Sequence, residues 1–129
     1  MNETYVVDTR TFAYYLADRL TRKADEAFKK AEMHKSTIVI PTIAIAELIY
    51  ILEKSKAESE IWDMMHTIDT YPSFQLHPLD EDILRMIPDV KLKELHDRII
   101  VATCLLLKAE GLITRNSEIK RSGLVKIIW

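Results

Sequence analysis

Short apolar runs rich in β-branched residues alternate along the chain with longer stretches whose apolar residues recur at helical spacing. The runs predict strands at residues 4–8, 36–40, 74–77, 112–114 and 124–128. Helices are expected between them, over residues 11–34 with a break near 18–21, over 41–54, from 55 onward, from 80 onward and over 96–110. This alternation is typical of a parallel sheet covered on both faces. We therefore expect an α/β fold, a three-layer sandwich with a central parallel sheet flanked by helices.

Local signals place several helix ends. Pro41 suits the first turn of a helix, because its missing N–H would have no partner there. Asp80 is a suitable N-cap, and Ser55 followed by Glu58 resembles a capping box. Gly111 suits the position just after the C-terminus of the helix over 96–110.

Length and composition fit one domain over residues 1–129, with 48% hydrophobic residues to build a core. The net charge of -2 argues against a nucleic-acid partner held by bulk positive charge alone. The single cysteine, Cys104, cannot form an internal disulfide. The N-terminus lacks the basic-then-apolar order of a signal peptide, and no apolar run is long enough for a membrane span. We therefore expect a cytoplasmic protein without membrane association. With only two glycines, phosphate-binding glycine loops are excluded.

Three carboxylates lie in segments that otherwise favour burial. Asp8 ends the first predicted strand, Glu47 is the only charge in the apolar helical stretch 43–51, and Asp97 opens the most apolar helix. Each has a structural alternative: Asp8 as a helix cap, Glu47 paired with a lysine or arginine, and Asp97 as a cap or a partner of Arg98. Buried carboxylates are rarely kept unless they are paired or bind a metal. Their coincidence favours a site for a hard cation such as Mg²⁺ or Mn²⁺.

The segments around these carboxylates resemble the motifs of PIN-domain nucleases. The resemblance covers essentially the whole chain in order, and its most specific part is the third segment. The segments are YVVDT at 5–9, IPTIAIAEL at 40–48, LHDRIIVAT at 95–103, LITRN at 112–116 and VKIIW at 125–129. Short members of this family include VapC-like toxins of toxin–antitoxin pairs.

The resemblance implies a PIN-like sandwich and a Mg²⁺- or Mn²⁺-dependent endoribonuclease that hydrolyses RNA phosphodiester bonds. By position, Asp8, Glu47 and Asp97 would be metal ligands, and the fourth acidic position falls at Asn116. Asparagine offers a carbonyl oxygen without charge. Three consequences stay open. The site holds one metal tightly and a second weakly, or Glu118 or a water supplies the fourth ligand. The third is that the protein is catalytically weak.

Four further residues are candidates beside the carboxylates. Thr9 and Thr114 would be hydroxyls that orient the ligands or waters, with backbone capping as the alternative. Arg98 and Arg115 would contact phosphate or steady a carboxylate, with a structural ion pair as the alternative.

Two competing functions stay open at this point. Asn116 is consistent with a non-catalytic PIN-like domain that binds RNA or a protein and cleaves nothing. A phosphatase or phosphotransferase on a similar sheet is disfavoured, because Arg10 stands where an Asp-x-Asp nucleophile motif would have its second aspartate.

The resemblance also implies partners besides RNA, namely an antitoxin that covers the active site and a second copy in a homodimer. Two groups of apolar residues offer surface for such contacts, with core packing as the alternative. They are the aromatic group Phe12, Tyr14 and Tyr15 and the helical stripe Ile61, Met64, Met65 and Ile68.

Overall fold

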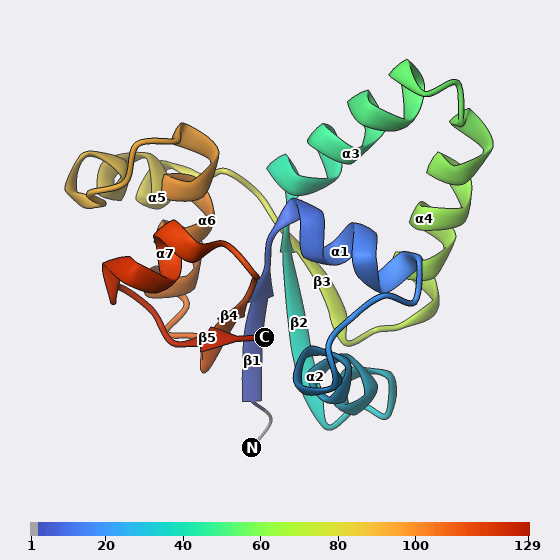
Figure 1. Cartoon of the computed structure of the whole chain (residues 1–129), viewed down its shortest axis with the longest axis horizontal. Helices are drawn as coiled ribbons and strands as arrows, with labels where there is room; N and C mark the ends of the chain where they lie inside the picture. The colour runs from blue at the N-terminus through green and yellow to red at the C-terminus, as the bar shows by residue number, and fades with distance from the viewer. Residues whose placement is uncertain (1–2) are drawn as a thin grey trace.

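The computed structural model describes residues 3–129, and within them five strands form one parallel sheet in the order β3-β2-β1-β4-β5. β1 lies in the middle, so its carboxyl end opens at the centre of the sheet edge (Figure 1). The strands are β1 Glu3–Val7, β2 Ser36–Pro41, β3 Phe74–His77, β4 Gly111–Ile113 and β5 Ile127–Ile128.

Helices cover the sheet on both faces, which confirms the predicted three-layer α/β sandwich (Figure 1). One layer contains α1 Thr9–Leu16, α2 Arg22–Glu32, α3 Thr42–Lys54 and α4 Glu58–Thr70. The other contains α5 Glu81–Met86, the 3-10 turn η1 Ile87–Asp89, α6 Leu95–Leu106 and α7 Ser117–Ser122.

The alternation of side chains along the strands builds a core on each face of the sheet. In β1, Tyr5 and Val7 pack against the α1–α4 layer, while Val6 packs against the α5–α7 layer. In β2, Ile38 faces the first layer and Val39 the second. Since successive strand residues point to opposite faces, a continuous apolar run is needed when both faces are covered. This is why these strands read as unbroken β-branched runs.

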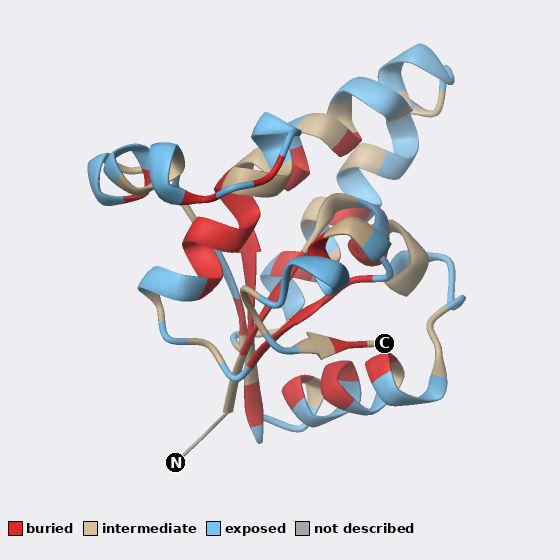
Figure 2. Ribbon diagram, turned by 60° about the vertical axis from the view of Figure 1, so that its left-hand side comes forward, coloured by how far each residue is buried: buried red, intermediate tan, exposed pale blue. Residues whose placement is uncertain are grey.

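Helix α6 is the most deeply buried helix. Six consecutive residues, Ile99 to Cys104, are buried, and Figure 2 shows this helix red along much of its length while the outer helices expose one side. Its apolar circumference therefore reflects contact with the sheet on one side and with α5 on the other. Asp97 stands in the first turn of this helix.

Several predicted boundaries are confirmed and others are wrong. The break near residues 18–21 is real, because α1 ends at Leu16 and Asp18 adopts a left-handed backbone. Asp80 caps α5 as predicted, accepting from Ile83 N at 3.0 Å. The capping box at Ser55 is wrong: α4 has Ala57 as its N-cap residue, without a side-chain cap.

The other errors lie near strand ends. Pro41 is the last residue of β2 and the N-cap residue of α3, rather than a first-turn residue. Gly111 begins β4, and the left-handed residue after α6 is Lys108. The final strand is shorter than the predicted 124–128, because only Ile127–Ile128 pairs with β4.

The apolar groups considered for partner contacts lie mostly in the core. Phe12, Met64 and Ile68 are buried, so the core-packing alternative holds for them. Tyr15 stacks on Phe28 with ring centroids 4.3 Å apart. Among residues 3–129, no helix combines the length and apolar character needed to cross a membrane.

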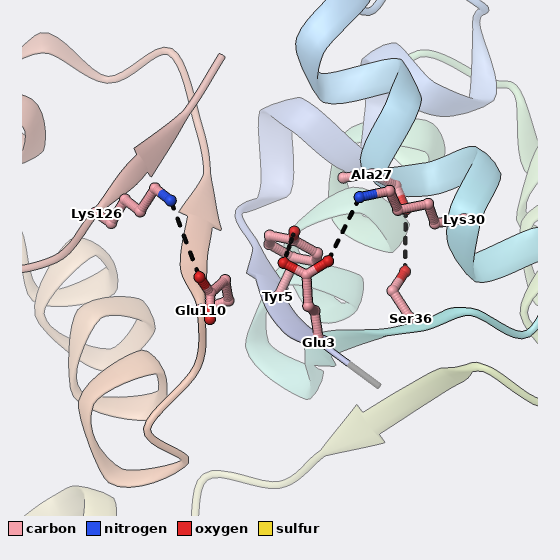
Figure 3. Close-up of polar contacts among 7 residues, drawn as sticks. All are labelled: Glu3, Tyr5, Ala27, Lys30, Ser36, Glu110 and Lys126. Carbon is pink, nitrogen blue, oxygen red and sulfur yellow. Dashed lines mark hydrogen bonds and ion pairs between the residues drawn. The ribbon is translucent and has the colours of Figure 1, made fainter. Parts of the chain in front are cut away.

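Polar contacts at the amino end of the sheet tie strands to neighbouring elements (Figure 3). Glu3 accepts from the Tyr5 hydroxyl at 2.9 Å and pairs with Lys30 of α2 at 3.4 Å. Ser36 donates to Ala27 O at 3.2 Å. These contacts lie at the opposite end of β1 from Asp8.

Candidate active site

A cleft of about 730 Å³ lies at the carboxyl end of the central strand, between α1 and α3 on one side and α6 and α7 on the other. In open α/β sheets this edge is where ligands bind. All four acidic or amide residues predicted from the sequence line it, and so do Thr9 and Arg115. The polar lining residues are Asp8, Thr9, Arg10, Glu47, His96, Asp97, Arg115, Asn116, Ser117, Glu118 and Arg121.

Asp8 follows β1 and serves two purposes at once. One carboxylate oxygen, Oδ1, accepts from Thr11 N at 2.8 Å and so caps α1. The other, Oδ2, accepts a hydrogen bond from the hydroxyl of Thr114, a fully buried residue. The cap predicted as an alternative is therefore present, and it fixes the carboxylate at the cleft with neutral donors.

Asn116 links α7 to Asp97. Its Oδ1 accepts from Ile119 N at 3.0 Å, which caps α7. Its Nδ2 donates to Asp97 Oδ2 at 3.3 Å. Because a backbone N–H can only donate, the capping bond fixes the amide with its oxygen toward the helix and its NH₂ toward the cleft. The carbonyl oxygen that Asn116 could offer to a metal thus accepts the capping bond of α7.

Asp97 carries an electrostatic cost in this position. Partial burial, followed by the negative charge of Asp8, raises the pKa of the Asp97 carboxyl above its ordinary value, and the hydrogen bond from Asn116 opposes this shift. Burial disfavours the charged form of a carboxyl, and a second carboxylate nearby does the same. Asp8 and Asp97 therefore lie close enough to repel each other, a repulsion that a bound cation would relieve.

Glu47 is held on the opposite wall by two neutral or ring donors. Thr9 Oγ1 donates to Glu47 Oε1 at 2.6 Å, and His96 Nδ1 lies 2.6 Å from Glu47 Oε2. The structural alternative for Glu47, a pair with a lysine or arginine, is replaced in the structure by a pair with His96. The sequence clue that His96 lies in the cleft is its position directly before Asp97 on the same helix.

The arginines at the cleft differ partly from those predicted. Arg98 is not among the lining residues, because its Nε donates to Leu92 O at 2.5 Å and braces the segment before α6. Arg115 does line the cleft, and Nη1 donates to the Tyr14 hydroxyl at 3.0 Å. Arg10 and Arg121 line it as well, and no sequence motif singled them out as site residues.

The donor chemistry fits a hard cation, although the donors are not gathered into a closed set. Asp8, Glu47 and Asp97 supply carboxylate oxygens, the ligands that Mg²⁺ and Mn²⁺ prefer. Within the described part of the chain, no three His, Cys, Asp or Glu side chains are grouped closely enough for a ready metal site. The repelling pair Asp8 and Asp97 is the observation that fits a cation best.

Solved structures share this fold. VapBC2 from Rickettsia felis, bound to a DNA fragment from its promoter, has a TM-score of 0.76 at 17% identity, covering 96% of each chain. A toxin–antitoxin complex from Klebsiella pneumoniae has a TM-score of 0.60 at 25% identity, covering 88% of each chain. VapC20 from Mycobacterium tuberculosis, a toxin that cleaves the sarcin–ricin loop, has a TM-score of 0.68 at 11% identity, covering 97% of this chain and 99% of that one.

Sequence comparison gives the family directly. No curated protein matches the chain significantly. The family model of the PIN domain, however, matches residues 5–123, a span that includes all the candidate carboxylates and Asn116. The fold, the cleft at the end of β1 and this match agree, and the chain belongs to the PIN domain family.

Proposed function

We propose that this chain is a metal-dependent endoribonuclease, the toxin of a VapBC-type toxin–antitoxin pair. The observation that carries the proposal is that Asp8 and Asp97 line one cleft, where the charge of Asp8 raises the pKa of Asp97 and, within residues 3–129, neither carboxylate pairs with a cationic side chain. Such a pair is costly unless a cation binds it. Membership of the PIN domain family and the toxin neighbours point to the same activity.

Asp8, Asp97 and Glu47 are the residues that would hold Mg²⁺ or Mn²⁺. When bound, the cation would polarise the phosphate and lower the pKa of a water ligand, the chemistry that hydrolysis of a phosphodiester requires. The chain's own hydrogen bonds hold the three carboxylates in place. Asp8 accepts from the Thr114 hydroxyl and from Thr11 N. Asp97 accepts from Asn116, and Glu47 accepts from Thr9 and His96.

The first test of this proposal is cleavage of a labelled mixed-sequence RNA. We expect fragments with MnCl₂ and none with EDTA, because the acidic residues alone provide neither a nucleophile nor a positive charge for the phosphate. Denaturing gels read the products. Intact RNA under every metal condition, with protein that is folded by circular dichroism, would favour the non-catalytic binding domain that the use of Asn116 Oδ1 in a helix cap also allows.

Replacing Asn116 by Asp restores a fourth carboxylate at the cleft. The variant keeps an oxygen for the α7 cap, but exchanges the NH₂ donor facing Asp97 for negative charge. Without metal we expect a melting temperature a few degrees lower, since a loss of about 1 kcal/mol shifts a domain of this size by that much. With MnCl₂ we expect a larger thermal stabilisation than in the wild type. Asn116→Ser, which keeps a capping oxygen without the charge, is the control; an equal Mn²⁺ shift in all three proteins would contradict this role for position 116.

The toxin assignment brings two protein partners with it, an antitoxin and a second copy of the chain, in the cytoplasm. Exposed apolar side chains on α3 and α4 provide surface for such contacts: Tyr50 and Ile51 on the first helix and Trp62 on the second. Ile51 also lines the cleft, so a partner on this surface would reach the carboxylates. Co-expression with the product of the adjacent reading frame, followed by light scattering, measures both associations.

A further inference from the structure

Three arginines line the same cleft as the carboxylates and come from separate segments. Arg10 belongs to the first turn of α1, Arg115 follows β4, and Arg121 lies on α7. Within residues 3–129, none of them forms an ion pair with a carboxylate. All three are exposed to solvent, so each is accessible to a ligand in the cleft.

Two arginines outside the cleft pair with carboxylates. Arg85 pairs with Glu81 at 2.5 Å, and Arg22 pairs with Glu26 at 3.8 Å, each one turn along its own helix. In the cleft the carboxylates instead accept from hydroxyl, amide, backbone and imidazole donors. The guanidinium groups are thereby left available, and the cleft keeps negative and positive groups apart. This arrangement suits a ligand that brings anionic groups for the arginines.

Arg115 is held ready for such a ligand. Nη1 donates to the Tyr14 hydroxyl at 3.0 Å, and Cζ lies 5.7 Å from the centroid of the same ring. Tyr14 in turn packs against Trp129, with ring centroids 6.0 Å apart. A guanidinium held by a ring and a hydroxyl loses less conformational entropy when it binds, and most of its five N–H donors stay free.

We propose that Arg10, Arg115 and Arg121 bind successive backbone phosphates of a single RNA strand that crosses the cleft. The identity of the polyanion rests on the proposed ribonuclease function. Phosphates match the planar fork of guanidinium and recur at regular intervals along one strand, so separate arginines meet separate groups. Tyr14 and Trp129, both partly exposed beside Arg115, add ring surface of the kind on which the bases of a single strand stack.

The test is binding of a fluorescein-labelled mixed-sequence oligoribonucleotide, followed by anisotropy in EDTA over a series of salt concentrations. Each of Arg10→Gln, Arg115→Gln and Arg121→Gln should reduce the slope of log K against log salt by about 0.7, and weaken binding about five-fold at 0.1 M salt. Arg22→Gln is the matched control, since it removes the same charge from a side chain that is 95% exposed on α2. It should bind RNA like the wild type.

Three results would overturn the proposal. The cleft variants could show the same slope of log K against log salt as Arg22→Gln, or the wild type could bind no RNA. The third is that polyglutamate of the same length as the RNA binds as tightly as the RNA and depends on the same arginines. The last result would assign the arginines to an acidic protein segment. Cleavage and binding separate the two proposals. Binding that depends on the arginines without cleavage would remove the nuclease function alone, whereas cleavage with unchanged slopes would remove only the phosphate contacts.

Discussion

Substitution of Asp97 by Asn is expected to lower Mn²⁺-dependent RNA cleavage by about 100-fold or more while the protein stays folded. The size follows from the several kcal/mol that a bound cation contributes to phosphoryl-transfer transition states, since each 1.4 kcal/mol or so is tenfold in rate. The fold should survive because an asparagine oxygen at position 97 still accepts from Asn116 Nδ2. Gel analysis of labelled RNA under single-turnover conditions measures the effect.

The same variant should be more heat-stable than the wild type in EDTA at pH 7. Burial and the charge of Asp8 raise the pKa of Asp97, so the folded state binds this proton more tightly than the unfolded chain does. The charged carboxyl therefore costs stability above its pKa in the folded state and costs none below about pH 3.9, where both states are protonated. The gain in melting temperature from Asp97→Asn should accordingly be present at pH 7 and vanish in acid.

Asp69→Asn is the matched control for both measurements. Asp69 is exposed on α4, outside the residues that line the cleft, so its substitution should change neither cleavage nor melting temperature. Wild-type cleavage in Asp97→Asn would rule out this carboxylate as a metal ligand. A lower melting temperature in EDTA would mean that the Asp97 charge is stabilised by the fold rather than opposed by it.

Replacing Phe28 by Ala is expected to cost about 3–5 kcal/mol of unfolding free energy, the usual range for truncating a fully buried phenylalanine. Phe28 is 0% exposed and stacks on Tyr15 with centroids 4.3 Å apart. Its ring also meets Phe74 of β3 edge-on at 6.0 Å. The truncation thus leaves a cavity that joins α1, α2 and the sheet, and urea unfolding followed by circular dichroism measures the loss.

Trp62→Ala provides the comparison for that loss. Trp62 is a large aromatic residue like Phe28, but it is 74% exposed on α4. Its removal should change the unfolding free energy by less than about 0.5 kcal/mol. Equal losses in the two variants would mean that Trp62 is covered in solution, for instance by a second copy of the chain, and would direct attention to the α3–α4 surface.

The sequence predicted most of the secondary structure because local patterns govern it. The strands β1 and β2 follow from runs of apolar, mainly β-branched residues, and the cap of α5 follows from Asp80. The errors occur where local signals compete. Ser55 and Glu58 have the letters of a capping box, yet α3 ends at Lys54 and the chain turns before α4 begins. At Gly111 the pairing of β4 with its neighbours outweighed the glycine preference for a helix end.

The sequence by itself determined the layer architecture, and through its motifs it indicated Asp8, Glu47, Asp97 and Asn116 as members of one site. It could not determine which other side chains share the cleft, because the direction of a side chain depends on the packing of its whole element. Adjacent helix residues point about 100° apart, so Arg98 turns to Leu92 while Asp97 faces the cleft. The tertiary structure alone brought Arg10 and Arg121 beside the carboxylates, turned the Asn116 oxygen into a helix cap and paired Glu47 with His96. These contacts join segments distant in sequence, and no local pattern records them.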